Sequence, residues 1–271
     1  MNEGPMFFDK NVIDLDLGTQ VTITITDSVA TDTGSTAVDY MRDRKNSDGW
    51  ATTGSTDAAN TQIDVNIGDM SEIGSILLVN HNFKAYTIQY KSGSNYVDFS
   101  TVIAETANAD SVKFHQFTPV STQYIRIIVT GAIVANADKY LSQLILTNMI
   151  GQLTDGWRVS EIQMDKDRVA TKTLSGRVRV KRTQGAFKCR MSKSNVTNSY
   201  DMNVVETLFD YYDGFLVWIA ANDTTRFMMD RIGWRMQDIY LMNIVTEYEP
   251  EWADGYYSRG MNAQFDLVES L

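Results

Sequence analysis

Hydrophobic and polar positions alternate with a period of two through much of the first half of the chain. In IDVNIG (residues 63–68) every second residue is polar or glycine, which is the pattern of a strand with one buried face. ILLV (residues 76–79) is a continuous apolar run, typical of a strand covered on both faces, and YIRIIV (residues 124–129) is an apolar strand with a single charge. Together these segments predict the two faces of a β-sandwich.

Polar and turn-forming residues separate further strand patterns. The remaining strands expected in this half lie at residues 12–17, 21–26, 86–90, 97–103, 114–117 and 140–146. Between residues 27 and 60 the composition changes to Asp, Thr, Ser, Gly and Ala, with Tyr40 and Trp50 embedded. This stretch predicts a long loop region, and loops of that length within a domain often carry function.

The second half begins with a strand pattern and a basic hairpin. Residues 157–164 are strand-like, and Val178, Val180 and Phe187 then alternate with Lys and Arg. A turn at residues 183–185 is expected to join the two arms of this hairpin. Further strands are expected at residues 215–220, 226–229, 238–248 and 264–268.

The segment from about residue 199 to 213 predicts a helix. Its apolar residues recur with helical spacing and form one wide face. Asn198 or Ser199 can cap the first turn, because a short side-chain oxygen satisfies the first free N–H groups. Gly214 is the expected stop.

Length and charge limit the classes of protein that this chain fits. With 271 residues it is long enough for two domains with separate cores, and we expect them at residues 1–148 and 149–271, both mostly β. The net charge is −10, and residues 1–148 hold 17 acidic against 9 basic side chains. This balance argues against nucleic-acid binding and against attraction to anionic membranes, since both depend on Lys and Arg.

The single cysteine, Cys189, excludes an internal disulfide, and its alternating surroundings predict a small buried residue. The first ten residues lack the form of a signal peptide, and no apolar run approaches the roughly 18 residues of a membrane span. We therefore expect a protein that folds in a reducing cytoplasm and does not insert into membranes.

Motifs that would indicate an enzyme do not occur. His81 and His115 are the two histidines and lie outside any HExxH pattern, and there is no GxSxG, P-loop or GxGxxG run. Asp and Glu are abundant enough to leave a glycoside-hydrolase pair open, but no pair stands out. We therefore expect no catalytic residues, no zinc site and no cofactor.

An ordered series of segments resembles the discoidin-like (galactose-binding-like) jelly roll, in versions found in bacteriophage tail proteins. Asp48-Gly49-Trp50 precedes IDVNIG and IGSILLVNHN, and YTIQYKSG and FTPVSTQYIRIIVTG follow. The resemblance covers roughly residues 11–148. It implies a jelly-roll β-sandwich whose ligand surface is formed by loops at one end of the barrel.

That resemblance makes Tyr40, Trp50 and His81 candidates for glycan contact, because they fall near such loops. The alternative for Trp50 is a plug at the barrel end, and the alternative for His81 is a turn residue after a strand. Discoidin-like domains sometimes hold Ca²⁺ with acidic loops. Asp14 and Asp16 therefore either bind calcium or lie on a solvated strand face.

Residues 157–271 resemble the distal-tail and tail-tube family of phage proteins. The order of strand, hairpin (GRVRVKRTQG, residues 176–185), helix, GFLVWIA and FDLVE carries this resemblance. It implies a tail-tube-like β-sandwich with one helix, and copies that assemble as a ring, with a hexamer as the expected form. Because the jelly roll comes first, either the module order is swapped or residues 1–10 belong to the second module.

Opposite charges indicate how neighbouring copies would meet in such a ring. A heterologous contact would place the basic hairpin of one copy against an acidic C-terminal segment of the next, and the alternative is a solvated basic face. The hairpin is a poor nucleic-acid site, because Phe187 is the single aromatic residue among its charges. The candidates for this subunit interface are Arg177, Arg179, Lys181, Glu247, Glu249 and Glu251.

The function expected from these patterns is structural. We predict a virion protein of a bacteriophage tail, a distal-tail or baseplate ring component that joins the tail tube to the tip and is assembled in the host bacterial cytoplasm. Its expected partners are copies of itself, other tail proteins and, through the jelly roll, cell-surface glycan. The alternative is a carbohydrate-binding module for host recognition or adhesion.

Overall fold

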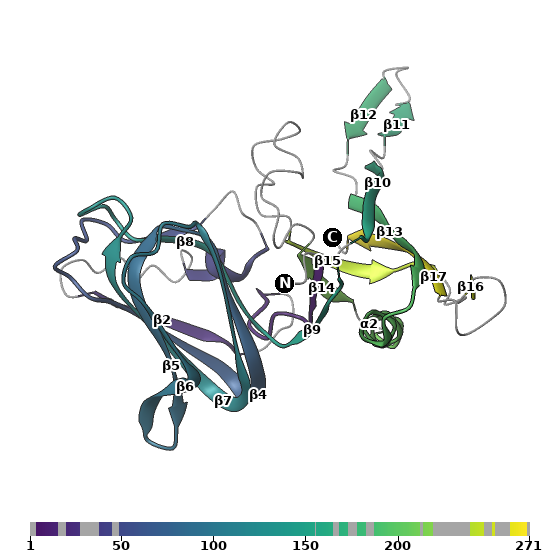
Figure 1. Ribbon diagram of the computed structural model, residues 1–271. Helices are drawn as coiled ribbons and strands as arrows, with labels where there is room; N and C mark the ends of the chain where they lie inside the picture. Colours follow the sequence, from purple (N-terminus) through teal and green to yellow (C-terminus); the bar gives the residue numbers. More distant parts are fainter. Residues whose placement is uncertain are drawn as a thin grey trace. The chain divides into compact units, whose positions relative to one another are not determined.

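The computed structural model describes residues 4–15, 20–27, 38–44, 49–154, 156–164, 168–172, 178–182, 187–211, 214–218, 239–246, 251–252 and 261–269. These residues are mostly in strands, so the predicted fold class is confirmed. They divide into two compact units, residues 9–149 and residues 4–8 together with the described residues from 150 onward (Figure 1).

The first unit is a jelly-roll sandwich. Its strands are β2 (Thr22–Asp27), β3 (Trp50–Ala51), β4 (Thr61–His81), β5 (Phe83–Ser92), β6 (Asn95–Glu105), β7 (Val112–Ala132) and β8 (Tyr140–Thr147). They are ordered β3-β8-β4-β7-β5-β6, and β2 pairs with β4. A short 3₁₀ helix, η2 (Tyr40–Arg42), precedes β3.

Two long strands, β4 and β7, run through both faces of this sandwich. Their antiparallel pairing extends from Thr61↔Val129 to Val79↔Val112, with a break in register near the middle. At that corner Gly68 has φ of 91°, a left-handed conformation that glycine adopts without strain. Before the corner β4 also pairs with β2, and after it with β8. Backbone hydrogen bonds therefore connect the two faces.

The hydrophobic pattern of the sequence maps directly onto this core. Ile63, Val65 and Ile67 lie in the core and alternate with half-buried polar residues. After the corner, residues 76–79 are all buried, as the continuous apolar run predicted. Aromatic rings fill the end of the core near the β5–β6 hairpin, where the Phe99 and Phe117 centroids lie 3.9 Å apart.

The second unit is built on one sheet and one helix. The strands are β1 (Met6–Phe8), β9 (Met149–Gln152), β10 (Arg158–Met164), β13 (Phe187–Val196), β14 (Phe215–Trp218), β15 (Ile239–Ile244), β16 (Glu251–Trp252) and β17 (Met261–Glu269). The order is β10-β13-β17-β15-β14-β1-β9, and β16 pairs with β17. The helix is α2 (Ser199–Phe209).

Strand β1 shows where the first residues belong. It pairs with β14 and is the neighbour of β9 in the same sheet. Gly4 N donates to Leu153 O (3.1 Å), and Leu153 N donates to Pro5 O (3.0 Å). The jelly roll is therefore inserted between two adjacent strands of the second unit. The expected first domain, residues 1–148, included residues 4–8, which the structure places in the second unit.

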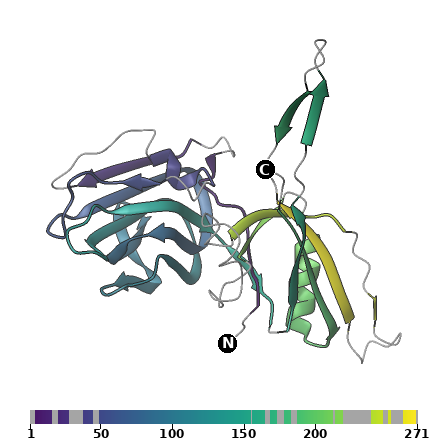
Figure 2. The same ribbon diagram turned by 90° about the horizontal axis from the view of Figure 1, so that it is seen from above.

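Helix α2 begins at the predicted cap. Asn198 Oδ1 accepts a hydrogen bond from Tyr200 N (2.9 Å). The helix ends at Phe209, whose ring lies 6.1 Å from that of Phe265 on β17, and not near residue 213 as expected. Figure 2 shows the helix along one face of the curved sheet. The apolar residues that α2 buries are Val204, Val205 and Leu208.

Asp201 lies in the first turn of α2 and is fully buried. Its carboxylate accepts hydrogen bonds from Thr154 N (2.9 Å), Thr154 Oγ1 (2.5 Å), Trp157 Nε1 (3.1 Å) and Lys193 Nζ (3.1 Å). Burial by itself raises the pKa of Asp201, but these hydrogen bonds bring that pKa below its ordinary value. The ionised carboxylate therefore links helix α2 to β13 and to Thr154 and Trp157, which lie between β9 and β10.

The basic segment departs from the predicted hairpin. β12 (Val178–Arg182) pairs with β11 (Arg168–Lys172) in a two-stranded sheet, and β13 pairs instead with β10 and β17. The predicted pairing of residues 177–182 with 188–193 is wrong. It failed because residues 168–172 were not identified as a strand that competes for the same partner.

Two short segments differ from the pattern that the sequence predicted. Residues 12–13 form a turn, because the Asn11 side chain replaces strand pairing by donating to Leu144 O (3.0 Å) and accepting from Leu146 N (3.0 Å). Residues 149–152, expected as a connector, form β9. The strand expected at residues 226–229 lies outside the described ranges.

Cys189 lies in β13 and is fully buried with a free thiol, as predicted. Burial, aided by Asp266, raises the pKa of this thiol to about 12, so it stays protonated and unreactive. Among the residues described, no helix is both long enough and apolar enough to cross a bilayer.

Replacing Asp201 with Asn tests its structural role. We expect Asp201→Asn to lower the free energy of unfolding by about 2 kcal/mol, because Lys193 would lose its charged acceptor in a buried site. The exposed Asp210 at the end of the same helix is the control, and Asp210→Asn should change stability by less than about 0.5 kcal/mol. Urea unfolding at pH 7 measures both, and equal effects would contradict the assignment.

Candidate functional site

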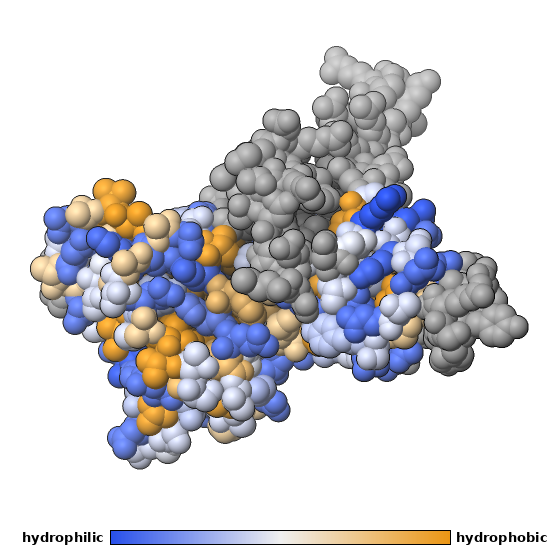
Figure 3. Space-filling view, in the orientation of Figure 1, coloured by the Kyte–Doolittle hydropathy of each residue, from blue (hydrophilic) through white to orange (hydrophobic). Residues whose placement is uncertain are grey.

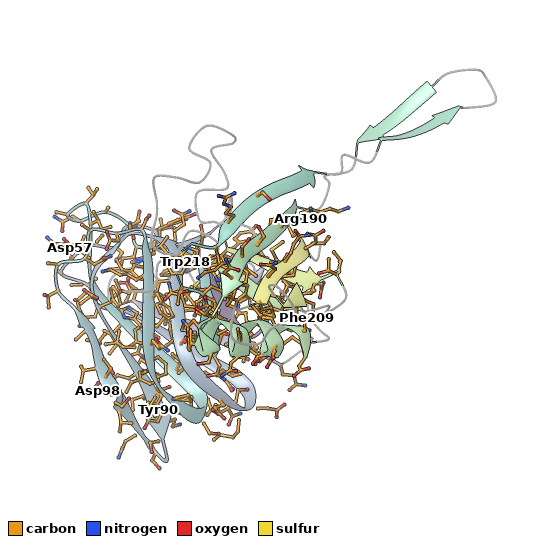
Figure 4. All side chains as sticks on the ribbon, turned by 45° about the vertical axis from the view of Figure 1, so that its right-hand side comes forward. Asp57, Tyr90, Asp98, Arg190, Phe209 and Trp218 are labelled. Atoms are coloured by element: carbon orange, nitrogen blue, oxygen red, sulfur yellow. The ribbon has the colours of Figure 1, made fainter. Side chains whose placement is uncertain are left out.

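Loops gather at one end of the jelly roll, which we call the apex. It is formed by residues 52–60, 106–111 and 133–139, together with Asn82. Backbone hydrogen bonds connect these loops, from Thr52 N to Lys139 O (2.9 Å) and from Ile133 N to Asn82 O (2.7 Å). Figure 4 shows Asp57 at this end and Tyr90 and Asp98 at the opposite one.

A buried lysine lies beneath the apex surface. Lys139 is fully buried, and its ammonium donates to Ser55 Oγ (2.7 Å), Thr56 O (3.0 Å) and Ala59 O (2.7 Å). An ammonium group has three donors, and all three are satisfied here. The cation therefore gathers the 52–60 loop around itself and ties it to the 133–139 loop.

A carboxylate balances this cation. Asp27, also buried, accepts hydrogen bonds from Ser55 Oγ (2.9 Å) and from Thr61 Oγ1. Burial lowers the pKa of Lys139, and the charges of Asp27 and other nearby carboxylates oppose that shift. Ser55 thus bridges the two charges, donating to one and accepting from the other.

The apex carboxylates are held in fixed positions. Asp138 Oδ1 accepts from Thr52 Oγ1 (3.1 Å) and from Ser55 N (2.9 Å). Asp57 Oδ1 accepts from Ala132 N (2.9 Å), and this hydrogen bond is the main reason why the pKa of Asp57 is below its ordinary value. Both carboxylates reach the surface, Asp138 more than Asp57. They are acceptors that need no rearrangement before binding a ligand.

Amide and apolar groups complete the apex surface. Asn82 Nδ2 donates to Asp138 O (2.7 Å), and Asn136 is exposed with φ of 60°. Val134 is 69% exposed and lies beside the exposed Ile133. Figure 3 shows apolar residues interspersed among polar ones at this upper end of the jelly roll. Fixed polar groups next to an exposed apolar pair can bind a ligand that has both hydroxyl groups and C–H faces.

His81, a predicted glycan contact, lies inside the core at the apex end. It is 3% exposed, and its ring packs against Phe83 (5.2 Å) and Tyr86 (6.0 Å). Nδ1 accepts from Phe83 N (3.0 Å), so the neutral ring carries its proton on Nε2, which has no acceptor among the described residues. A ligand outside the sandwich cannot reach this ring in this conformation.

Burial lowers the pKa of His81 to about 4, and the charges of His115 and Lys113 add to that shift. His115 is less deeply placed, and its Nε2 lies 2.9 Å from the hydroxyl of Tyr86. Burial lowers the pKa of His115 as well, so both imidazole rings are neutral at neutral pH, and each packs against the ring of Tyr86. They are structural groups in this arrangement.

The other two predicted contacts differ from each other. Trp50 is fully buried in the core. Tyr40 is 41% exposed at the start of η2, and its carbonyl accepts from Gln143 Nε2 (2.8 Å). Of the three residues, Tyr40 is the one whose side chain a ligand in solution can touch.

Asp14, one of the two residues considered as calcium ligands, forms an ion pair with Arg44. Arg44 forms two hydrogen bonds with the buried Asp14, of 2.6 Å and 3.0 Å. Asp16 lies outside the described residues. Within the described part of the chain no group of three or more His, Cys, Asp or Glu side chains is arranged to hold a metal ion.

The predicted subunit-interface residues are described in part. Arg177, Glu247 and Glu249 lie outside the described residues. Arg179 and Lys181 lie in β12, and Glu251 lies in β16. The sequence analysis did not identify Lys139 as a site residue, since one lysine before an apolar strand gives no distinguishing signal.

Comparison with known proteins supports the jelly roll. The F5/8 type C domain family, the discoidin-like domain, matches residues 22–142. No curated protein matches the chain.

The solved structures that match this chain cover about half of it. Chitosan-binding module 1 of the chitosanase/glucanase from Paenibacillus sp. IK-5 is 20% identical, with a TM-score of 0.39, over 50% of this chain and 97% of that module. Module 2 of the same enzyme, solved with chitotriose, is 19% identical, with a TM-score of 0.38, over 48% and 98%. The CpGH89CBM32-6 protein produced by Clostridium perfringens is 12% identical, with a TM-score of 0.39, over 51% and 99%.

Removing the buried ammonium group should loosen the apex. We expect Lys139→Met to lower the free energy of unfolding by about 3 kcal/mol, because Asp27 and two carbonyls would remain buried without their cation. Lys84 is exposed at the same end, and Lys84→Met should change stability by less than about 0.5 kcal/mol. Chemical denaturation of both variants checks this, and a neutral Lys139→Met would contradict the role assigned to the ammonium group.

Acid should destabilise the jelly roll through His81. The unfolded chain binds a proton near pH 6.5 and the folded one near pH 4, so stability falls as pH decreases through this window. We expect this residue to account for about 3 kcal/mol of that loss. His81→Asn keeps an acceptor for Phe83 N and removes the titration. Between pH 7 and pH 4 the unfolding free energy of the wild type should fall by about 3 kcal/mol more than that of His81→Asn.

Proposed function

We propose that this chain is a non-catalytic glycan-binding protein, whose jelly roll binds a sugar chain at the apex. The observation that carries the proposal is the apex itself. Exposed Asp138 and half-buried Asp57 accept hydrogen bonds from Ser55 N and Ala132 N, and buried Lys139 holds the 52–60 loop through Ser55 Oγ. The apolar pair Ile133 and Val134 belongs to the same apex. Preformed acceptors lose little entropy on binding, which favours recognition of hydroxyl groups.

The domain match supports this proposal. The F5/8 type C family covers the strands that frame the apex, and the discoidin-like resemblance implies ligand loops at one end of the barrel. Among the described side chains that reach the surface at this end, the carboxylates Asp57, Asp110 and Asp138 outnumber the ammonium groups of Lys84 and Lys113. We therefore propose a glycan without acidic groups as the ligand.

In this proposal the second unit is the scaffold to which both ends of the jelly roll are attached. The jelly roll leaves from β1 and returns at the adjacent β9, so the sheet of the second unit holds both ends. The assignment to a bacteriophage tail, with a ring of copies joining tube to tip, remains a prediction. It rests on the resemblance of residues 157–271, and the matched family covers residues 22–142.

Glycan-array binding followed by calorimetry with the whole chain tests the proposal. We expect saturable binding of an uncharged or amino-bearing oligosaccharide, weakened about tenfold by Val134→Ala and by Asn136→Gly, which corresponds to about 1.4 kcal/mol. Gly is used at position 136 because it accepts the positive φ.

Met70 provides the matched control. It is 64% exposed, close to the 69% of Val134, and lies at the corner of β4. Met70→Ala should leave the affinity unchanged. Absence of saturable binding on the array, or equal losses from both alanine variants, would refute an apex glycan site. Turnover of a bound oligosaccharide would refute the non-catalytic assignment.

A further inference from the structure

The connection between β4 and β5 is a single residue, Asn82, which lies between His81 at the end of one strand and Phe83 at the start of the other. Two hydrogen bonds attach this turn to the loop that follows β7. Asn82 O accepts from Ile133 N (2.7 Å), and Asn82 Nδ2 donates to Asp138 O (2.7 Å). The turn is therefore part of the framework that holds the apex together.

The 106–111 loop is attached to the same turn. His81 N donates to Ser111 O (2.9 Å), and Asn108 Nδ2 donates to Phe83 O (2.7 Å). Because both loops are bonded to this one short turn, a displacement of His81 would loosen them together.

The imidazole of His81 takes part in the turn as a hydrogen-bond acceptor. Its Nδ1 accepts from Phe83 N (3.0 Å), and Nε2, which carries the proton of the neutral ring, has no acceptor among the described residues. A second proton can therefore bind only at Nδ1. It would replace the acceptor by a donor that faces the N–H of Phe83, so the protonated ring cannot keep its place in the turn.

The strands on either side of His81 offer a protonated ring no compensating charge. From β5, Phe83 and Tyr86 pack against the imidazole, and on β8 Leu141 is its register partner. None of these three side chains carries a negative charge in acid.

Charged groups near His81 come from β7 and from the loop before it. His115 and Lys113 oppose a positive charge on the ring, and Asp110 favours one. Lys113 Nζ lies 3.1 Å from the carboxylate of Asp110 and 3.8 Å from that of Glu105, so both carboxylates are already paired with an ammonium group. Burial has the largest effect, and the pKa of His81 falls to about 4.

We propose that the apex is an acid-sensitive element, in which protonation of His81 releases the turn and the two loops bonded to it while the β4–β7 ladder stays paired. The ladder between residues 61–66 and 124–129 is apolar on its buried face and contains no histidine. Release of a bound glycan in acid would follow, and that consequence alone rests on the proposed function.

Amide hydrogen exchange of the whole chain, followed residue by residue by NMR without any ligand, tests the proposal. We expect the equilibrium constant for opening to rise about twentyfold between pH 7 and pH 5, because the released ring binds a proton near pH 6.5 and the buried one near pH 4. After correction for the direct effect of pH on exchange chemistry, protection of the His81, Asn82 and Ile133 amides should fall by the same factor. Low concentrations of urea should change this protection little, since local opening exposes little surface.

Amides of the ladder are the internal control. Val65 and Ile127 should be more strongly protected than the apex amides at both pH values, and their exchange should increase steeply with urea, as for complete unfolding. Equal protection and equal urea dependence of the two sets in the wild type would show that His81 is protonated only when the whole sandwich unfolds, and would overturn the proposal.

Two variants assign the effect to His81. His81→Asn keeps an acceptor for Phe83 N, and its apex protection should be the same at pH 7 and pH 5. His115→Gln removes the other histidine and should retain the loss of about twentyfold. An unchanged acid response in His81→Asn would also overturn the proposal, and the wild-type comparison decides if that variant does not fold. No glycan enters these measurements, so this proposal and the proposed function fail independently.

Discussion

The antiparallel pairing of β4 with β7 is the constraint on which the jelly roll depends. Each strand turns the corner between the two faces, so a single continuous ladder fixes the register of both. A slip by one residue would move Ile63, Val65 and Ile67 from the core to the surface. This ladder also positions the apex, because the 133–139 loop follows the end of β7 and Asn82 follows the end of β4.

Among the described residues, Lys139 in the jelly roll and Asp201 in the second unit are fully buried ionised side chains that position irregular segments. Lys139 gathers a loop through hydroxyl and carbonyl oxygens, and Asp201 gathers a connector through amide, hydroxyl and ammonium donors. Burying such a charge is costly unless its hydrogen bonds are all made. Because Lys139 and Asp201 make these hydrogen bonds in full, they stabilise one arrangement of the surrounding backbone over others.

The periodicity of the sequence predicted the strands of the jelly roll and the capped helix, because burial on one face leaves a repeating signal. It did not reveal β11, so β12 was paired with β13, whose actual partners include β17, a strand far along the chain. The candidate site was predicted less well. Trp50 and His81 were identified by type, but the fold places them inside the core, and Lys139 became recognisable only once Ser55, Thr56 and Ala59 were seen around it.

The neighbouring positions of β1 and β9 have a consequence for how such a chain can change. The 4–8 segment and the strand that follows the jelly roll are hydrogen-bonded to each other, so the host sheet is complete whatever is placed between them. Domains whose two ends lie close together are readily exchanged. Evolution could therefore replace the entire sandwich by a module of different specificity, or a short turn, while the supporting sheet kept its strand order.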